Sequence, residues 1–266
     1  MTQFKLKRFF ILLEIFGINL KQLYIAFLSL PWFLKNIYLF IQLKKQQKKI
    51  EFSWKIFPIF TDRFESSGYL KGHYFHQDLM IAQKIFENKP ANHLDIGSSI
   101  YGFVSHVASF RLIEVVDIRD NTSQTENIKF KKLDIMNFEP EKIQKYDSIS
   151  CLHVVEHFGL GRYNDKINYN GHIVGLKNIA KINSENGFFY LSTPIGKATI
   201  YFNAHRVFNV NYILKIIEPY YKLLEFHFVD DNGILWKNQN AVTFNSELLD
   251  YGCGIFILRR NNIEVN

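Results

Sequence analysis

The chain has 266 residues, of which 47% are hydrophobic and 21% charged, so it is long enough for a full core and general disorder is excluded. The net charge of +7 is concentrated in the first fifty residues and no basic stripe follows, which disfavours a nucleic-acid partner. The two cysteines, Cys151 and Cys253, lie in separate apolar stretches, which excludes a disulfide framework and favours a reduced, cytosolic setting.

The first fifty residues form a basic, aromatic segment in which Glu14 is the only acidic residue. Its cationic residues are Lys5, Lys7, Arg8, Lys21, Lys35, Lys44, Lys45, Lys48 and Lys49. The longest uncharged run, residues 22–34, is too short to span a bilayer, and no signal-peptide cleavage site follows. Two interpretations stay open. The segment either contacts an anionic membrane surface peripherally, or it forms a pair of amphipathic helices that pack on the domain or on another subunit.

Residues 54–266 predict one domain in which strands and helices alternate, preceded by a helical segment over residues 1–53. Apolar residues at helical spacing predict a helix over residues 72–90, which Pro90 ends. The later elements are strands at 92–98, 113–120, 128–135 and 187–195, helices at 101–110, 171–182 and 209–220, and an antiparallel pair at 222–231 and 252–260. Residues 146–157 predict a strand that runs into a turn or short helix. This order predicts a Rossmann-like α/β fold, with a doubly wound, mostly parallel sheet and a C-terminal antiparallel strand.

A turn of small residues ends the first predicted strand, in the stretch HLDIGSS. Gly97 allows the backbone to approach a ligand, Ser98 and Ser99 are small, and the next helix offers its amide groups. Asp95 could hold a cationic or amide group at the strand end. A dinucleotide fingerprint needs glycine where Ser99 stands, which disfavours an NAD-linked sugar oxidoreductase.

Two further acidic residues follow the next two strands. Asp117 stands about 20 residues after the turn, where a carboxylate reaches ribose hydroxyls. Asp134 ends the third strand, where it can face an adenine amino group. One such residue is often only a turn former, but three at successive strand ends favour a nucleotide-like cofactor.

These motifs, in this order, resemble the Rossmann-like S-adenosylmethionine-dependent methyltransferases. HLDIGSS is similar to their first motif, VVDIRD to the acidic second, KKLDI to the third, and YDSISCLHVVEH to the segment that faces the transferred methyl group. The resemblance implies S-adenosylmethionine as cofactor, with Asp95 and Gly97 near its methionine moiety, Asp117 at the ribose, and Asp134 with Ile135 at the adenine. The full predicted cofactor set is Asp95, Gly97, Ser98, Ser99, Asp117, Ile118, Asp134, Ile135 and His153.

Four longer phrases resemble a narrower family more closely. KGHYFHQDLMIAQKIF, CLHVVEHFGLGRY, FNAHRVF and DYGCGIFIL are similar to an uncharacterised methyltransferase-like family catalogued as a domain of unknown function. That family implies the fold and the cofactor, but no established reaction.

The candidate catalytic residues lie in LHVVEHFGLGRY and NAHR. His153, Glu156 and His157 share one face if their segment is helical. His157 is the favoured general base, Glu156 orients it or binds a substrate hydroxyl, and His205 completes the predicted set. Alternatively, Glu156 and His157 cap a turn or pair with Arg162. The same side chains are metal-ligand types, but nothing in the sequence makes them converge, so no metal is predicted.

The candidate acceptor-binding residues are Arg162, Tyr163, Asn203 and Arg206. Arg206 either clamps a carboxylate or phosphate of the acceptor, or pairs with Glu156 or Asp165 to hold two loops together.

The segment before the first predicted strand supplies further polar residues. Asp78 is expected to cap the helix that follows it. The methyltransferase resemblance implies Tyr74 and His76 as candidate lid groups over the cofactor.

The sequence therefore predicts a cytoplasmic S-adenosylmethionine-dependent methyltransferase, working in solution or at the inner face of the membrane. The resemblance implies a small-molecule, glycan or glycolipid acceptor, because similar proteins occur with polysaccharide biosynthesis enzymes. A non-catalytic scaffold or nucleotide-binding module is the alternative, since a fold alone does not prove activity.

Overall fold

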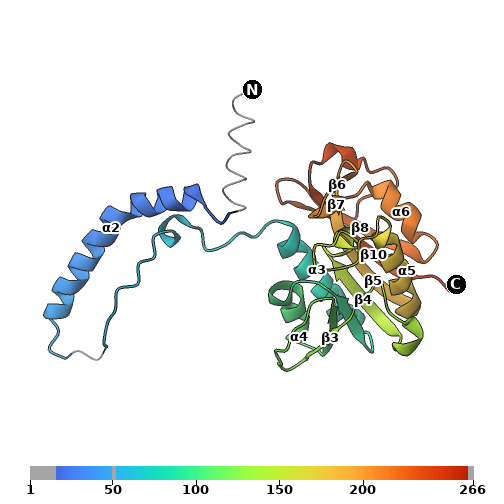
Figure 1. Cartoon of the computed structure of the whole chain (residues 1–266), viewed down its shortest axis with the longest axis horizontal. Helices are drawn as coiled ribbons and strands as arrows, with labels where there is room; N and C mark the ends of the chain where they lie inside the picture. Colours follow the sequence, from blue (N-terminus) through green and yellow to red (C-terminus); the bar gives the residue numbers. More distant parts are fainter. Residues whose placement is uncertain (1–15, 50–51, 263–266) are drawn as a thin grey trace. The chain divides into compact units, whose positions relative to one another are not determined.

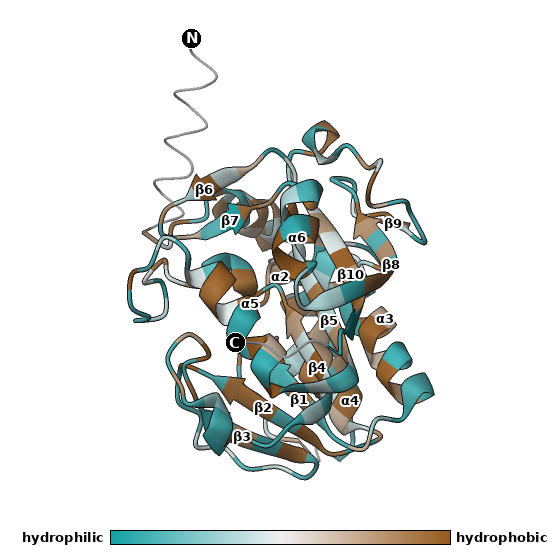
Figure 2. Ribbon diagram, turned by 90° about the vertical axis from the view of Figure 1, so that its right-hand side faces the viewer, coloured by the Kyte–Doolittle hydropathy of each residue, from teal (hydrophilic) through white to brown (hydrophobic). Residues whose placement is uncertain are grey.

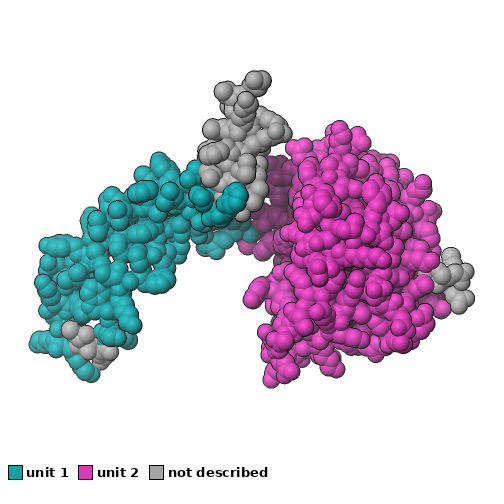
Figure 3. Space-filling view, viewed as in Figure 1, with its two compact units in different colours: residues 1–69 teal, residues 70–266 magenta. Residues whose placement is uncertain are grey.

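The computed structural model describes residues 16–49 and 52–262. The chain divides into two compact units, residues 1–69 and 70–266, which Figure 3 shows in different colours. The sequence prediction put the boundary at residues 53 and 54; residues 54–69 group with the first unit because they contact its helix. The predictions for Lys5, Lys7, Arg8 and Glu14 lie outside the described residues.

In the first unit, the described residues 16–49 contain one long helix, α2 (Leu20–Lys45). The interpretation of a helix pair also involves residues that lie outside the described ones. Asn19 caps its first turn by accepting a hydrogen bond from Gln22 N at 2.9 Å. The helix continues through Pro31, although an interior proline removes one backbone hydrogen bond. Residues 22–34 remain the longest uncharged run, because Lys21 and Lys35 flank it, but the helix that contains this run is longer. Among the described residues, α2 is long and apolar enough, by length and composition, to cross a membrane.

An extended segment after α2 contacts the same helix. The Ser29 hydroxyl donates to the Phe60 carbonyl at 2.7 Å, and the Phe33 and Phe60 rings meet edge to face at 5.3 Å. Trp54 packs against Phe40 at 5.7 Å. These contacts cover little of the helix. Exposed apolar side chains on α2 include Leu23, Tyr24, Phe27, Leu28, Leu34, Tyr38 and Leu39.

The second unit is built on one eight-stranded sheet with the order β3-β2-β1-β4-β5-β10-β8-β9. Its strands are β1 (His93–Ile96), β2 (Ile113–Asp117), β3 (Ile128–Lys132), β4 (Tyr146–Leu152), β5 (Asn183–Ile195), β8 (Tyr221–Val229), β9 (Leu235–Trp236) and β10 (Gly252–Arg260). Strands β1 to β5 are parallel, and β10 lies antiparallel between β5 and β8. This arrangement confirms the predicted Rossmann-like fold class.

Helices cover both faces of the sheet (Figure 1). On one face lie α3 (His73–Asn88), the π-turn η2 (Ile100–Val104) and the short α4 (Ser105–Ala108); on the other lie α5 (Gly171–Ile182) and α6 (Val210–Ile217). Hydrophobic and hydrophilic residues alternate along α3 and α6, as Figure 2 shows, so each helix turns an apolar side to the sheet. Short 3₁₀ turns complete the fold: η1 (Asp62–Phe64), η3 (Pro140–Lys142), η4 (Val155–His157) and η5 (Ser246–Leu248).

Two local features differ from the sequence prediction. A hairpin of β6 (Thr199–Tyr201) and β7 (His205–Val207) forms where a loop was expected. Helix α3 begins at His73, one turn before Asp78, so Asp78 does not cap it. Asp78 is buried inside the helix instead, where it accepts hydrogen bonds from Gln77 Nε2 at 3.1 Å and from the backbone of Phe103.

Candidate active site

A cavity in two parts lies at the carboxyl ends of β1 to β4, the edge at which parallel sheets bind ligands. The inner slot has a volume of about 70 Å³ and mostly apolar walls, with Ile118, Leu133, Asp134, Ile135, Met136 and Phe158 among its lining residues. The outer basin has a volume of about 480 Å³ and more polar walls, including Tyr74, Ser98, Ser99, Glu156, Arg162, His205 and Tyr251. Gly97, Asp117, Arg119, His153, His157 and Tyr163 line both parts.

The turn after β1 brings the backbone to the cavity. Gly97 has a φ of +65°, which side chains rarely adopt, and a Cβ there would lie 3.0 Å from a methyl carbon of Val154. Ser98 and Ser99 follow in the wall of the basin. Ser99 also caps η2, because its hydroxyl accepts a hydrogen bond from Gly102 N at 3.3 Å.

Asp95 does not line the cavity, although the sequence placed it among the cofactor contacts. It is fully buried and accepts hydrogen bonds from the Ser98 amide at 3.0 Å, the Ser98 hydroxyl at 2.6 Å and the Ser150 hydroxyl at 2.6 Å. Burial raises the pKa of Asp95 to about 6, although the hydrogen bonds from Ser98 and Ser150 lower it. Its carboxyl group therefore shapes the turn that carries Gly97.

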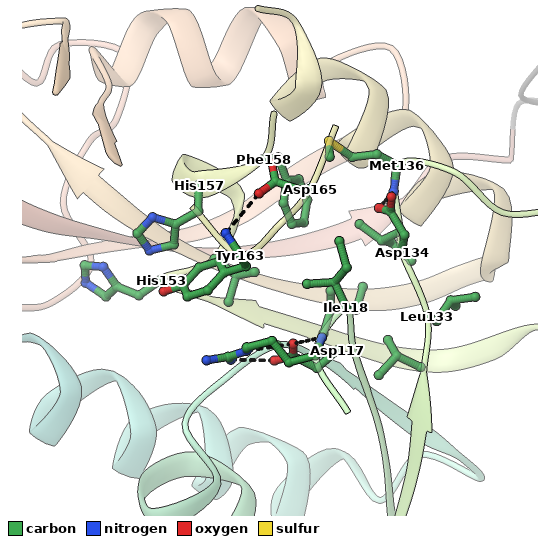
Figure 4. Close-up of a pocket in the computed structure, with 16 residues that line it drawn as sticks. Asp117, Ile118, Leu133, Asp134, Met136, His153, His157, Phe158, Tyr163 and Asp165 are labelled. Carbon is green, nitrogen blue, oxygen red and sulfur yellow. Dashed lines mark hydrogen bonds and ion pairs between the residues drawn. The ribbon is translucent and has the colours of Figure 1, made fainter. Parts of the chain in front are cut away.

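Asp117 lies at the end of β2 on the border between slot and basin (Figure 4). Its carboxylate is engaged by Arg119 in a bidentate pair, Nε to Oδ1 at 2.9 Å and Nη2 to Oδ2 at 2.6 Å. The guanidinium also lies over the Tyr163 ring, 4.6 Å from the centroid. Arg119 was not among the predicted site residues, although it stands only two residues after Asp117, which was a local signal.

The slot continues from Asp117 toward the loop after β3. Ile118, Asp134 and Ile135 line it, at the positions that the methyltransferase resemblance indicated for the cofactor. Asp134 accepts a hydrogen bond from Met136 N at 2.9 Å (Figure 4). The apolar walls that Leu133, Met136 and Phe158 add were not predicted, since an apolar residue after a strand looks like ordinary core.

His153 and Glu156 form a buried pair directly after β4. His153 Nδ1 lies 2.9 Å from Glu156 Oε1, and the Thr193 hydroxyl donates to the other carboxylate oxygen at 3.4 Å. The backbone of His153 has a φ of +56°, an uncommon conformation for a residue with a side chain. Burial by itself lowers the pKa of His153, but Cys253 and the Glu156 carboxylate together raise it well above its ordinary value.

His157 faces both parts of the cavity with a defined tautomer. Its Nδ1 lies 2.7 Å from the Ala204 carbonyl oxygen, which can only accept, so Nδ1 carries the proton and Nε2 keeps its lone pair. Burial lowers the pKa of His157, while Glu156 Oε1, 3.9 Å from Nε2, acts in the opposite direction. The imidazole is therefore neutral near pH 7 and can accept a proton at Nε2.

The β6–β7 hairpin separates the predicted residues of the NAHR stretch. His205 lines the basin, and its ring packs against Tyr251 with centroids 5.1 Å apart. Burial, and then His157, lower the pKa of His205. Asn203 is exposed and does not line the cavity, so the structure does not bring it to the site.

Arg206 is also outside the cavity, buried behind its wall. Its guanidinium donates to the carbonyl oxygens of Glu156 at 3.3 Å, Phe158 at 2.7 Å and Tyr169 at 3.0 Å. The clamp interpretation of Arg206 is thus corrected. Arg206 joins loops, the alternative that the sequence left open, but through backbone carbonyls instead of carboxylates.

Arg162 and Tyr163 do reach the cavity from the loop after η4. Arg162 Nη1 donates to the Ala204 carbonyl at 3.0 Å, which links this loop to the β6–β7 hairpin. Tyr74 and His76 were the two residues predicted to form a lid over the cofactor. Tyr74 lines the basin, and His76 does not.

Comparison with solved structures finds a similar fold in methyltransferases. N-methyltransferase NodS from Bradyrhizobium japonicum WM9, in complex with S-adenosyl-L-homocysteine, is 14% identical, with a TM-score of 0.50 over 71% of this chain and 88% of that chain. An S-adenosylmethionine-dependent methyltransferase from Clostridium acetobutylicum ATCC 824 is 14% identical, with a TM-score of 0.49 over 71% and 92%. The 1,6-didemethyltoxoflavin-N1-methyltransferase of Burkholderia thailandensis is 12% identical, with a TM-score of 0.48 over 70% and 79%.

Sequence comparisons give a narrower match. No curated protein matches the chain. The family model described as "Caenorhabditis protein of unknown function, DUF268" matches residues 104–234, which run from η2 to the loop before β9. The chain therefore has the Rossmann-like fold of the S-adenosylmethionine-dependent methyltransferases, with a DUF268 match across the centre of that fold, as its motifs indicated.

Proposed function

We propose that this protein is an S-adenosylmethionine-dependent methyltransferase that acts on a hydroxyl-bearing small molecule, glycan or glycolipid. The proposal rests on two side chains at the border between slot and basin. There a strand-end carboxylate, Asp117, and a neutral imidazole with a free lone pair, His157, line the same cavity.

The residues of the slot fit the proposed cofactor. The Asp117 carboxylate suits the two hydroxyls of a ribose, and the apolar walls around Ile118 and Ile135 suit a flat adenine ring with Asp134 beside its amino group. Gly97 leaves room for the chain of the cofactor next to the backbone. When bound, S-adenosylmethionine supplies an electrophilic methyl group.

The protein then has to bind the acceptor, orient it and remove its proton. His157 Nε2 accepts that proton, because Nδ1 is held by the Ala204 carbonyl and the ring starts neutral. The Glu156 carboxylate lies 3.9 Å from Nε2 and stabilises the imidazolium that results. His205 borders the same basin and orients the acceptor.

The basin suits a polar acceptor with flat faces. Tyr74, Tyr163 and Tyr251 place rings around it, and Arg162 adds hydrogen-bond donors. Aromatic faces with a few polar groups are suited to sugar rings, which have both apolar faces and hydroxyl edges. A glycan or glycolipid acceptor is therefore the form of the proposal that we favour.

Helix α2 supports a membrane location for this activity. Its apolar side chains are largely exposed, and Lys44 and Lys45 stand at its C-terminal end, where anionic headgroups attract cations. We propose that α2 anchors the protein at the inner face of a membrane, which would bring a glycolipid acceptor within reach.

Calorimetric titration of the full chain with S-adenosylhomocysteine tests the cofactor site. Wild type is expected to bind at micromolar affinity, and Asp117→Asn to bind at least about tenfold more weakly, because it loses a charge-assisted contact. Asp147→Asn is the matched control, since Asp147 belongs to β4 but does not line the cavity. Equal affinities for all three proteins would refute the assignment of Asp117.

A specific observation favours the second candidate, a scaffold without catalysis. Asp117 is already paired with Arg119, so its carboxylate is satisfied without a ligand. A folded wild-type protein that binds neither S-adenosylmethionine nor S-adenosylhomocysteine would establish the scaffold in place of the enzyme.

A further inference from the structure

We propose that His73, His153 and Cys253 form a zinc site beside the basin. Their donor atoms all lie within 4.8 Å of one another, and no carboxylate belongs to the set. The three residues come from separate parts of the fold: His73 begins α3, His153 directly follows β4, and Cys253 lies near the start of β10. We call them the His–Cys cluster.

The strongest observation is an unsatisfied nitrogen. His153 is 7% exposed, and its Nε2 is buried without a hydrogen-bond partner among the described residues. A buried polar atom left unpaired costs about 1–3 kcal/mol, so its retention calls for an explanation. A metal ion that accepts the Nε2 lone pair removes this cost.

The other ring nitrogen of His153, Nδ1, has a carboxylate partner, as histidine ligands in zinc sites commonly do. Nδ1 lies 2.9 Å from Glu156 Oε1, and a carboxylate behind a histidine ligand fixes its tautomer and strengthens it as a donor. The same carboxylate stabilises a cation in the cluster. The φ of +56° at His153 is backbone strain at the residue that supplies the unpaired nitrogen.

His73 and Cys253 complete the donor set. The His73 ring stacks on His153 at 5.2 Å, and one of its nitrogens bonds to the backbone of Tyr251, which leaves the other as a donor. Cys253 is fully buried; its sulfur has long contacts of 3.6 Å to Gln77 Oε1 and 3.8 Å to Gly254 O, and its side chain also interacts with His153, the neighbouring donor of the cluster. A thiolate ligand needs such a sheltered position without a strong competing partner.

Two imidazoles and a thiolate select zinc among common divalent ions, and three protein ligands are the number found in zinc sites with an open fourth position. That position takes water or a ligand from the basin, because the basin is lined by His153, by Tyr74 next to it, and by Tyr251 next to His73. Uptake of Zn²⁺ releases to solvent the thiol proton of Cys253 and any proton on the two donor nitrogens. The set differs from the His153, Glu156, His157 and His205 group weighed from the sequence.

The test is metal binding by the purified full chain. We expect about one zinc per chain by elemental analysis after purification with zinc in the medium. After removal by a chelator, Co²⁺ is expected to restore a thiolate-to-cobalt charge-transfer band and the intense visible bands of a four-coordinate site. Titration with Zn²⁺ should then abolish these bands at one equivalent.

Variants assign the ligands. His73→Gln and Cys253→Ser are expected to lower zinc affinity at least about tenfold, and Cys253→Ser to remove the charge-transfer band. Glu156→Gln should weaken zinc binding about 10–100-fold while it keeps that band. The matched controls, His76→Gln on the same helix and Cys151→Ser on β4, should bind zinc as wild type does.

Two outcomes would overturn the site: a folded wild-type protein that takes up no zinc or cobalt, or a zinc affinity that is the same in His73→Gln, Cys253→Ser and their controls. Circular dichroism of each protein confirms folding, and His73 is only partly buried, so its variant is not expected to unfold the chain. S-adenosylhomocysteine titration of the same samples reports on the proposed function separately, because Asp117 is not part of the cluster.

Discussion

Arg119 and Asp117 show how single side chains control access to the proposed cofactor site. The bidentate pair occupies both carboxylate oxygens, and Tyr163 supports the guanidinium from one face. The Arg119 side chain is 56% exposed, so water screens the pair and it contributes little to stability. A ribose can therefore displace Arg119 at small cost.

Replacement of Arg119 by alanine is expected to tighten S-adenosylhomocysteine binding by up to about fivefold, since an exposed ion pair is worth at most about 1 kcal/mol. Calorimetry on the variant measures this change. Lys131→Ala, which removes a cation from β3 outside the cavity, serves as control. Weaker binding by Arg119→Ala would mean that the guanidinium contacts the ligand itself.

The buried carboxyl of Asp95 predicts a pH dependence of stability. Its pKa is about 6 in the folded chain and 3.8 ordinarily, so the unfolded chain ionises first as the pH rises. The contribution of Asp95 to the free energy of unfolding is fully present below about pH 4 and is lost as the pH rises through 6. The total loss is about 3 kcal/mol at most.

Urea unfolding between pH 4 and 7 checks this expectation. The fall in the free energy of unfolding should be smaller in Asp95→Asn than in wild type, because asparagine has no charge to desolvate. Glu141→Gln, an exposed position, should follow wild type. A fall of the same size in Asp95→Asn would assign the pH dependence to other groups.

At the scale of elements, β10 joins the two halves of the sheet. It pairs antiparallel with β5 on one side and β8 on the other, and it carries Cys253 next to the cavity. Its side chains from Cys253 to Leu258 are almost completely buried. The strand thus contributes both to the core and to the His–Cys cluster.

Phe256→Ala is expected to destabilise the protein by about 3–5 kcal/mol, because the ring is fully buried and packs on Phe226 with centroids 5.0 Å apart. Leu224→Ala, on the neighbouring β8 and 46% exposed, should change the free energy of unfolding by no more than about 0.5 kcal/mol. Urea denaturation of both variants measures the difference. Equal effects would show that β10 is not part of the cooperative core.

For the molecule as a whole, the exposed apolar side chains of α2 are the basis of the proposed membrane anchor. Many large apolar side chains of α2 are exposed, although Lys21, Ser29 and Lys35 also belong to the helix. Its 26 residues are enough, by length and composition, to cross a bilayer.

Membrane fractionation of the full chain tests this conclusion. The protein is expected to stay in the membrane pellet through high salt and alkaline carbonate and to be released by detergent. Phe27→Glu with Leu34→Glu should move it to the soluble fraction, because each charge in the hydrocarbon region costs about 2–4 kcal/mol. Leu224→Glu on the second unit is the control. Release by carbonate alone would establish peripheral contact instead.

The amino-acid sequence was enough to predict most of the order of elements and the edge of the sheet at which the site forms. Apolar spacing predicted α5 over residues 171–182, the same bounds that the structure has, and Asp117 and Asp134 were recognised at their strand ends. These features depend on neighbours within a few residues, so side-chain type and local periodicity are enough to reveal them.

Which side chains reach the cavity depends on the packing of distant elements. Asp95 and Arg206 carry the charge expected of ligand contacts, but the packing of β4 and the β6–β7 hairpin gives them internal partners. His73, His153 and Cys253 are far apart in the chain, and the β4, β5 and β10 pairings together with α3 bring them together. Such contacts depend on the register between distant elements, and no local pattern encodes that register.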